Sequence, residues 1–309
     1  MKTTESSKYP PIIVIGGCTA SGKNELAISL AKDFNGIIVN ADSKQVFQEL
    51  QIGTARPVPD TTKSDHWVID GVKHYLYGYI SLFEDYNLYR YQQDCLSILS
   101  NLTAPIFLVG GTGLYINAII KRYNLKKQED LSNLRKSLEI MSVSQLQIIA
   151  GKKIFKMNNS DKNNKRRLIR LIEKSQQPPQ DQKTLMQDPL PHLYLIKDKS
   201  LEDLELDIVK RTQYMFESGL VEEVEQFKDL ILNDEPKLKI IGYQEFKEYF
   251  ENTIDLEHVK DLIILHTRQY TKRQRTWFRN QTSALKISDI AHQKDEIQHI
   301  ISNFLTSVS

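Results

Sequence analysis

The sequence predicts an α/β fold in which a parallel β-sheet is flanked by helices and carries a helical insertion. Three short runs of apolar, mostly β-branched residues have the composition of buried strands: 12–16, 37–41 and 107–109. The first run is followed by a glycine-rich loop and a segment of helical periodicity, an alternation typical of parallel sheets. A polar, helix-like stretch then interrupts this alternation.

The interruption divides the chain into three parts. We expect residues 1–121 to form the first part of the core, residues 122–190 to form a helical insertion domain, and residues 191–309 to complete the core with a helical C-terminal part. Within the insertion, MNNSDKNN (157–164) and QQPPQDQ (176–182) are typical of loops. Residues 281–309 predict a surface helix to which no role is assigned.

Composition excludes several classes of protein. The chain has 309 residues, 40% of them hydrophobic and 26% charged, with a net charge of +2, which is ordinary for a globular protein. No stretch approaches the roughly 18 uncharged apolar residues of a membrane helix, and the start MKTTESSKYP does not resemble a secretory signal. Cys18 and Cys95 form neither a disulfide framework nor a metal site on their own. We therefore expect a cytoplasmic protein without membrane contact, and a monomer.

The segment GCTASGKN at residues 17–24 predicts a phosphate-binding loop (P-loop) between strand and helix, and so a P-loop NTPase-like sheet. Gly17 and Gly22 let the loop curl, so that backbone N–H groups converge on an anion at the positive end of the following helix. Lys23 adds a point charge over the phosphates. A chance Gly/Ser turn ending in a surface lysine is the alternative, which the flanking strand and helix disfavour. The candidate phosphate ligands are Gly17, Cys18, Thr19, Ala20, Ser21, Gly22, Lys23 and Asn24.

Two residues of this loop each have more than one chemical interpretation. Asn24 stands where the motif has Ser or Thr, whose hydroxyl normally binds Mg²⁺. An amide oxygen can coordinate a hard cation, so Asn24 is a weak candidate metal ligand. Cys18 is either a reactive thiol at a helix N-terminus or a small residue filling a turn, and the second reading is favoured because no resolving Cys or His adjoins it.

Polar residues follow the other two predicted strands. Asp42 and Ser43 come at the end of the second strand, and GGTG with Thr112 follows the third. Ligands of open parallel sheets lie beyond the carboxyl ends of the strands, so these residues should face the crevice that holds the P-loop. Asp42 could bind Mg²⁺, accept a proton or cap a helix, and position alone leaves these alternatives open. A bare GGTG is weak, because most such runs are turns.

The segment DSKQVFQELQIGTARP (42–57), together with GCTASGK, resembles the tRNA dimethylallyltransferase family. Further segments match in family order: LVGGTGLYINAII (108–120), NNKRRLIRLIE (163–173), GLVEEV (219–224), IGYQEF (241–246) and TRQYTKRQRTWFR (267–279). The resemblance covers roughly residues 12–280, with Phe47 in place of Tyr and Arg56 in place of Lys. Order preserved over so many segments is more specific than any single motif.

The resemblance implies a reaction and the residues that perform it. It implies transfer of the dimethylallyl group from dimethylallyl diphosphate to N6 of the adenine 3′ of the anticodon (position 37) in tRNAs reading UNN codons, with Mg²⁺ as cofactor. Asp42 would accept the N6 proton, Thr112 would touch the reacting groups, and Lys23 would stabilise the leaving diphosphate. Arg211 would also approach the diphosphate. Where the family has arginines nearby, this chain has Leu201 and Asp207, so either that helix is placed differently or the enzyme is diverged.

Two basic stripes suggest the RNA partner. Lysines and arginines recur at helical spacing in each, and aromatic residues adjoin the second: Lys162, Arg166, Arg170 and Lys174 with Arg167 adjacent, and Arg268, Lys272, Arg275 and Arg279 beside Trp277 and Phe278. A solvated helix face is the alternative for each stripe. The resemblance favours contact with the tRNA anticodon stem-loop.

The same resemblance adds further tRNA contacts near the adenine. The complete candidate set is Asp42, Ser43, Lys44, Gln45, Thr112, Arg135, Arg166, Arg167, Arg170, Lys239, Gly242, Tyr243, Gln244, Arg268, Lys272 and Arg275. His74 falls where the family often has His, but a lone His is more often packed than catalytic.

Three other functions remain open at this point. An adenylate isopentenyltransferase would act on free AMP, ADP or ATP, and a P-loop kinase or NTPase would release γ-phosphate. A catalytically weakened tRNA-binding paralogue, suggested by Asn24 and Asp207, would bind tRNA without prenyl transfer.

Overall fold

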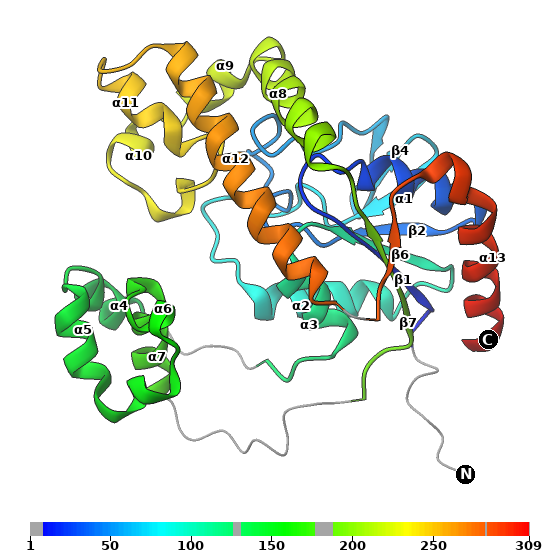
Figure 1. Ribbon diagram of the computed structural model, residues 1–309, viewed down its shortest axis with the longest axis horizontal. Coiled ribbons are helices and arrows are strands. Elements are labelled where there is room, and N and C mark those ends of the chain that lie inside the picture. Colours follow the sequence, from blue (N-terminus) through cyan, green and yellow to red (C-terminus); the bar gives the residue numbers. More distant parts are fainter. Residues whose placement is uncertain (1–8, 126–130, 177–187, 282, 309) are drawn as a thin grey trace. The chain divides into compact units, whose positions relative to one another are not determined.

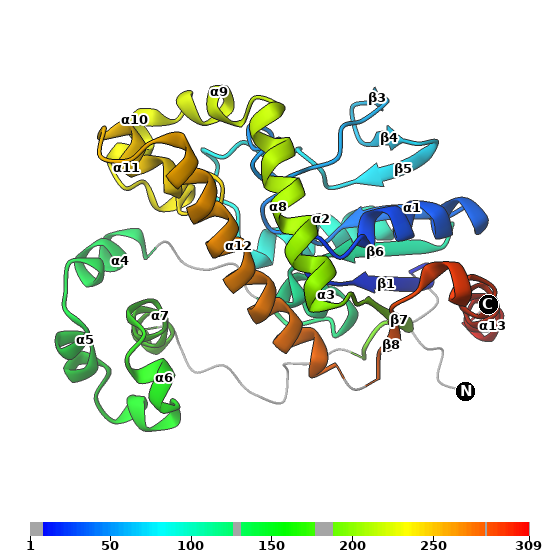
Figure 2. The ribbon, with the colours of Figure 1, turned by 45° about the horizontal axis from the view of Figure 1, so that its top comes forward.

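The computed structural model describes residues 9–125, 131–176, 188–281 and 283–308 and has the α/β architecture expected from the sequence (Figures 1 and 2). The chain forms two compact units, Met1–Tyr123 with Asp188–Ser309, and Asn124–Gln187. The second unit falls inside the range expected for the insertion. Each unit is described by itself.

The first unit contains one eight-stranded sheet in the order β3-β4-β5-β2-β6-β1-β7-β8. The strands from β5 to β8 in this order pair in parallel, and the β3-β4-β5 edge is antiparallel. Parallel order with β1 at the centre is the P-loop-like topology that the loop motif predicted. The strands are β1 (Ile12–Gly16), β2 (Ile37–Asn40), β3 (Thr61–Thr62), β4 (Trp67–Ile69), β5 (Val72–Tyr75), β6 (Ile106–Gly110), β7 (His192–Lys197) and β8 (Leu285–Ile287).

The helices cover both faces of this sheet and build the second unit. The helices of the first unit are α1 (Lys23–Asp33), α2 (Leu88–Leu99), α3 (Gly113–Ile120), α8 (Leu201–Glu217), α9 (Leu220–Glu225), α10 (Lys228–Leu232), α11 (Lys247–Phe250), α12 (Leu256–Arg279) and α13 (Ile290–Val308), with short 3₁₀ turns at Pro236–Leu238 and Gln244–Phe246. The second unit has α4 (Ser132–Glu139), α5 (Val143–Ala150), a 3₁₀ turn at Gly151–Lys156, α6 (Asn159–Lys162) and α7 (Lys165–Gln176). Within the described ranges, every helix is too short or too polar to cross a membrane.

Strand β1 is buried on both faces, which explains its continuous apolar run. Ile12 and Val14 pack with residues of α2, α3 and the end of α12. Ile13 and Ile15 point to the opposite face and pack with α1 and α13. The result is a three-layer core, and α13 covers one layer with Ile297 and Ile301 rather than lying free on the surface.

Two smaller cores lie outside the sheet. The α8–α12 region of the first unit gathers around Tyr243, Phe246 and Leu220, which are fully buried. In the second unit, α4, α5 and α7 bury Leu138, Leu146 and Leu168. Helix α5 begins at a capping box in which Ser142 and Gln145 satisfy each other's backbone N–H groups, so its start is fixed locally.

Gly110, the last residue of β6, lies too close to the neighbouring backbone for any side chain. A Cβ atom at this position would overlap the backbone carbonyl of Ala41, which precedes Asp42. We expect Gly110→Ala to lower the free energy of unfolding by about 3 kcal/mol, because the two strand ends must separate. Urea denaturation measures this loss. The control is Gly71→Ala, where a Cβ would have no atom within 4 Å and only the φ of +77° opposes the substitution. We expect this variant to lose about 1 kcal/mol. Equal losses of unfolding free energy in the two variants would contradict the prediction.

Candidate active site at the carboxyl ends of the strands

The loops that follow four strands meet at one edge of the sheet. Gly16 of β1 is paired with Gly110 of β6 and Ile196 of β7, and Asn40 of β2 is paired with Val109. The strands therefore end level with one another. The P-loop, Asp42 and Thr112 all begin within two residues of these ends, as the topological rule predicts.

The P-loop is shaped to receive an anion. Gly22 has φ +81°, and the next residue, Lys23, begins α1. Among the described residues, the N–H groups of Gly22, Lys23 and Asn24 have no hydrogen-bond acceptor, and they lie at the positive end of the helix dipole. The Ser21 Oγ is buried, also without a partner in the described chain. Unsatisfied donors concentrated in this way are suited to phosphate oxygens.

Lys23, Asp42 and Arg211 share one electrostatic environment. Burial lowers the pKa of Lys23, the charge of Asp42 partly offsets this, and the charge of Arg211 lowers the pKa further. Burial also lowers the pKa of Arg211, which the charges of Asp42 and Glu25 oppose. The three charged groups therefore lie within electrostatic range of one another. Lys23 follows the P-loop, Asp42 follows β2, and Arg211 belongs to α8.

Asp42 is held with one carboxylate oxygen engaged. Its N–H donates to Asn40 Oδ1 at 2.9 Å, and its Oδ1 accepts from the Lys44 N–H at 2.9 Å. The fully buried Asn40 is itself fixed by donation to the Leu76 carbonyl at 2.9 Å. The other oxygen, Oδ2, has no hydrogen-bond partner within the described chain. A carboxylate with one oxygen fixed and one available is suited to accepting a proton.

Thr112 is joined directly to the Asp42 loop. Its Oγ1 accepts from the Ser43 N–H at 3.1 Å and donates to Ser43 Oγ at 3.3 Å. Its N–H donates to the Ala41 carbonyl at 3.4 Å. The two loops that follow β2 and β6 are thus one hydrogen-bonded unit, as their common predicted role requires.

Three buried tyrosines lie within electrostatic range of Asp42. Burial, followed by the charge of Asp42, raises the pKa of Tyr270 to about 12, against hydrogen bonds to Thr112 and Gln274 that lower it. Burial and the same carboxylate also raise the pKa values of Tyr77 and Tyr115. All three rings therefore remain neutral at physiological pH. Tyr115 belongs to the core on one face of the sheet and Tyr77 to the core on the other.

Gln274 was missed by the sequence analysis. It is buried on α12, accepts from the Thr19 N–H at 2.9 Å and donates to the Gly111 carbonyl at 2.9 Å. It therefore ties the P-loop to the loop of Thr112. A Cβ at Gly111 would lie 2.5 Å from Gln274 Nε2, which explains the second glycine of GGTG. The available signal was its place in TRQYTKRQRTWFR, between the basic residues.

Arg211 and Asp207 answer the question raised by helix α8. Arg211 Nη2 donates to the Thr54 carbonyl at 3.1 Å, so α8 packs with this arginine against the segment that follows Asp42. Asp207 forms an ion pair with Lys199, which balances its charge. Leu201 is the exposed first residue of α8. The expected repulsion between Asp207 and a diphosphate is therefore offset by the charge of Lys199, which lies just before α8.

The candidate RNA contacts at residues 44–45 and 239–244 include both buried and exposed side chains. Gln45 is buried, and its Nε2 donates to the carbonyls of Thr54 and Ala55 at 3.1 and 3.2 Å. Lys44, Lys239 and Gln244 are exposed. Tyr243 is fully buried with its hydroxyl donated to Glu223, so only its backbone is left for a contact with RNA. Gly242 is also buried, with φ +96°.

Most of the predicted RNA-binding arginines are paired with acids. Arg135 and Arg170 both pair with the buried Glu173, and Arg167 pairs with Asp161. Arg268 pairs with Glu205 at 2.6 Å, and Arg275 pairs with Asp198 at 3.4 Å. Arg166 and Lys272 are exposed and have no ion-pair partner in the described chain.

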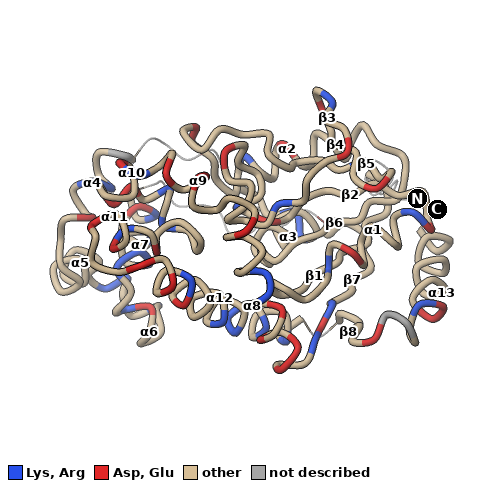
Figure 3. The backbone as a smooth tube through the Cα atoms, turned by 90° about the horizontal axis from the view of Figure 1, so that it is seen from above, with Lys and Arg blue, Asp and Glu red and all other residues tan. Residues whose placement is uncertain are grey.

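The prediction that Lys162, Arg166, Arg170 and Lys174 share one helix is wrong. The expectation placed Lys162 on a helix with Arg166, Arg170 and Lys174, but Lys162 ends α6 and α7 begins at Lys165. The break is local: Asn163 follows α6, and Asn164 Oδ1 accepts from the Arg167 N–H at 3.1 Å. The second stripe lies on one continuous helix, α12, along which basic residues recur (Figure 3).

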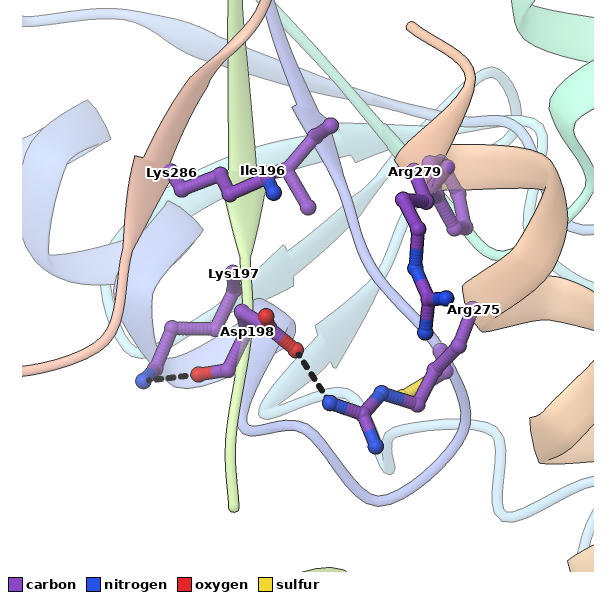
Figure 4. Close-up of a pocket in the computed structure, with 8 residues that line it drawn as sticks. Ile196, Lys197, Asp198, Arg275, Arg279 and Lys286 are labelled. Carbon is purple, nitrogen blue, oxygen red and sulfur yellow. Dashed lines mark hydrogen bonds and ion pairs between the residues drawn. The ribbon is translucent and has the colours of Figure 1, made fainter. Parts of the chain in front are cut away.

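The C-terminal end of α12 contributes to a basic pocket beside the P-loop (Figure 4). Arg275 crosses to Asp198, and Lys197 donates from Nζ to the carbonyls of Asp198 and Ser288 at 3.0 and 2.8 Å. The pocket is lined by Cys18, Ile196, Lys197, Asp198, Arg275, Phe278, Arg279 and Lys286. Burial raises the pKa of Cys18, so the thiol stays protonated and the turn-filling reading is supported.

Comparison with known proteins agrees with this geometry. A family model described as IPP transferase matches residues 45–281, and one described as Isopentenyl transferase matches residues 10–71. The tRNA dimethylallyltransferase of Synechocystis sp. is 38% identical over 288 residues, covering 90% of each chain. That of Microcystis aeruginosa is 38% identical over 282 residues, covering 89% of this chain and 86% of the relative.

Solved structures show the same fold. The tRNA isopentenylpyrophosphate transferase of Bacillus halodurans superposes with a TM-score of 0.70 at 28% identity, covering 97% of this chain and 98% of the other. That of Staphylococcus epidermidis gives 0.67 at 28% identity, covering 95% and 99%. By its sequence and by its fold, this chain belongs to the IPP transferase family.

Proposed function

We propose that this chain transfers the dimethylallyl group of dimethylallyl diphosphate to N6 of the adenine 3′ of the anticodon, position 37, in tRNAs that read UNN codons. The observation that carries the proposal is the hydrogen-bonded junction of three loops: Gln274 joins the P-loop at Thr19 to Gly111, and Thr112 joins the Asp42 loop at Ser43. Two cations suited to a diphosphate lie within electrostatic range of a carboxylate suited to a proton. Relatives named tRNA dimethylallyltransferase, aligned over nine-tenths of the chain, support tRNA as the acceptor.

The reaction is a substitution at the allylic carbon. The N6–C1 bond forms, the C1–O bond to diphosphate breaks, and the N6 proton passes to Asp42. An exocyclic amine is a poor nucleophile, and removal of its proton during attack keeps positive charge from developing on nitrogen. Thr112, fixed to Ser43, lies at the junction between this carboxylate and the P-loop. The target adenine must leave its stack, which costs a few kcal/mol.

The leaving diphosphate is stabilised by donors that are already in place. The N–H groups of residues 22–24, the Lys23 ammonium and the Arg211 guanidinium supply them. The residues also fit a Mg²⁺ that is held mainly by the diphosphate itself: Asn24 offers an amide oxygen, and Ser21 Oγ is unpartnered. No group of three or more His, Cys, Asp or Glu residues in the described chain would hold such an ion alone. When bound, the ion neutralises part of the charge that develops on the leaving group.

The same proposal includes a monomeric enzyme that works in the cytoplasm. Every side chain assigned to the reaction comes from one copy of the chain, so a monomer is sufficient. Both cysteines are free and buried, which agrees with a reducing compartment where tRNA is found.

The test is an incubation of the protein with radiolabelled dimethylallyl diphosphate, Mg²⁺ and either tRNA or one of AMP, ADP and ATP. We expect label in tRNA and N6-prenyladenosine by mass spectrometry of the digested nucleosides. Label in AMP, ADP or ATP would identify an adenylate isopentenyltransferase instead. Release of γ-phosphate from ATP would identify a kinase or NTPase, and tight tRNA binding without transfer would identify an inactive paralogue.

Lys272 gives a test of the RNA surface that is separate from catalysis. It is exposed on α12 and has no ion-pair partner in the described ranges, so it is available to an RNA phosphate. We expect Lys272→Gln to weaken tRNA binding and to reduce the salt slope of the binding constant by about one, as measured by filter binding across salt concentrations. Lys294→Gln, which removes a cation paired with Asp33 on α13, is the control and should leave the slope unchanged. Equal salt slopes for the two variants would show that Lys272 does not contact an RNA phosphate.

A further inference from the structure

Glu223 is a buried carboxylate with an unusual set of partners. Its two oxygens accept from three consecutive backbone N–H groups, those of Gln51, Ile52 and Gly53, at 2.8–3.1 Å. The Tyr243 hydroxyl also donates to it at 2.6 Å. Glu223 lies on α9, about 170 residues away from this turn in the chain.

Only an anion suits this position. Three successive N–H groups that converge on one point form a concave positive surface, and 9% exposure leaves little room for water to satisfy it. The nearby Arg56 is buried and balances the charge: burial lowers its pKa to about 10, and Glu223 acts to raise it. Close packing seals the contact, because a Cβ at Gly53 would lie 2.5 Å from the Tyr243 ring.

The turn that Glu223 holds is followed by Thr54, whose carbonyl is an acceptor for two of the candidate site residues. This single oxygen accepts from Arg211 Nη2 and from Gln45 Nε2, both at 3.1 Å. Arg211 is the cation proposed for the diphosphate, and Gln45 is a candidate tRNA contact. We propose that Glu223 is a positioning residue that, through the turn at residues 51–54, fixes Arg211 for diphosphate binding. The inference rests on the role proposed above for Arg211.

Binding of inorganic pyrophosphate, measured by isothermal titration, tests the inference without the acceptor. In Glu223→Gln, an amide NH₂ faces backbone donors in place of an oxygen, so the turn shifts and the Thr54 carbonyl moves. We expect Kd for pyrophosphate to rise about tenfold, the size of one lost charge-assisted contact. Glu222→Gln changes the adjacent, exposed carboxylate of α9 and should leave Kd unchanged.

A double substitution separates positioning from loss of structure. If Glu223 acts through Arg211, then Glu223→Gln should cost no further affinity in an Arg211→Gln background. Additive losses would overturn the inference, since they would show that Glu223 affects the site by another route. A Kd equal to that of the parent in Glu223→Gln would overturn it as well.

Tyr243→Phe keeps the test open if Glu223→Gln does not fold. It removes one donor to Glu223 but retains the buried ring, and we expect a Kd about threefold higher, again absent in the Arg211→Gln background. An unchanged Kd in this folded variant would count against the inference. If the parent protein binds no pyrophosphate at all, the proposed function fails first. If the parent binds but the variants match it, only the role of Glu223 fails.

Discussion

Replacement of Asp42 by asparagine is expected to lower kcat for prenyl transfer about a thousandfold, within the range for loss of a general base. The amide keeps the size of the side chain and can still accept from the Lys44 N–H, so the loop should keep its shape. It cannot accept the N6 proton. Pyrophosphate should bind at least as tightly, because a negative charge beside the anion site has been removed. Mass spectrometry of tRNA nucleosides and calorimetry measure the two effects.

Asp70→Asn is the matched control for this variant. Asp70 is an exposed carboxylate that pairs with Lys32 at 2.7 Å, and its loss should change neither quantity. A large fall in kcat for Asp42→Asn with intact pyrophosphate binding separates proton transfer from anion binding. Full activity in Asp42→Asn would remove the basis for the proposed chemistry.

The sequence predicted those features that local signals encode. The buried run IIVIG, the glycine loop and the periodicity of α1 are contiguous, so the P-loop could be placed with its strand and helix. Asp42 and Thr112 followed from the rule that strand ends in a parallel sheet lie at one edge. The continuous helix under the second basic stripe was also predictable, because its spacing has no interruption.

The supports of the site could not be predicted in this way. Gln274 donates to a loop 163 residues away, and Glu223 accepts from one about 170 residues away. No local periodicity records such contacts, since they depend on how α9 and α12 pack in three dimensions. Both residues lie inside matched segments, but beside Gln274 the basic residues Lys272 and Arg275 are the more conspicuous candidates. A buried polar residue has no comparable signature in sequence.

The misplaced basic stripe has a different cause. The four-residue spacing predicts one helix, but MNNSDKNN contains two asparagine caps, at Asn158 and Asn164. Asparagine side chains that bond nearby backbone N–H groups favour helix ends over helix interiors. The caps therefore outweighed the spacing of the charges, and the cationic surface of α7 begins only after residue 164.

Replacement of Lys23 by methionine should weaken pyrophosphate binding about a hundredfold and lower kcat/KM for dimethylallyl diphosphate by about a thousandfold. Methionine retains much of the volume and flexibility of lysine but not its charge. Among the residues that the structure describes, Lys23 Nζ makes a single long hydrogen bond, to the Cys18 carbonyl at 3.4 Å, so the melting temperature should change little. Lys32→Met, at the other end of α1 and half-exposed, is the control and should retain both properties.

The lowered pKa of Lys23 adds a pH dependence that distinguishes charge from packing. Burial favours the neutral amine, and the charge of Asp42 opposes this. Affinity for pyrophosphate should therefore be highest at pH values where Lys23 is protonated and should fall as pH rises through its lowered pKa. In Asp42→Asn the opposing charge is gone, so this fall should move to lower pH, whereas in Lys23→Met it should disappear. A fall at the same pH in Lys23→Met and in the parent would assign the titration to another group and would remove Lys23 from the anion site.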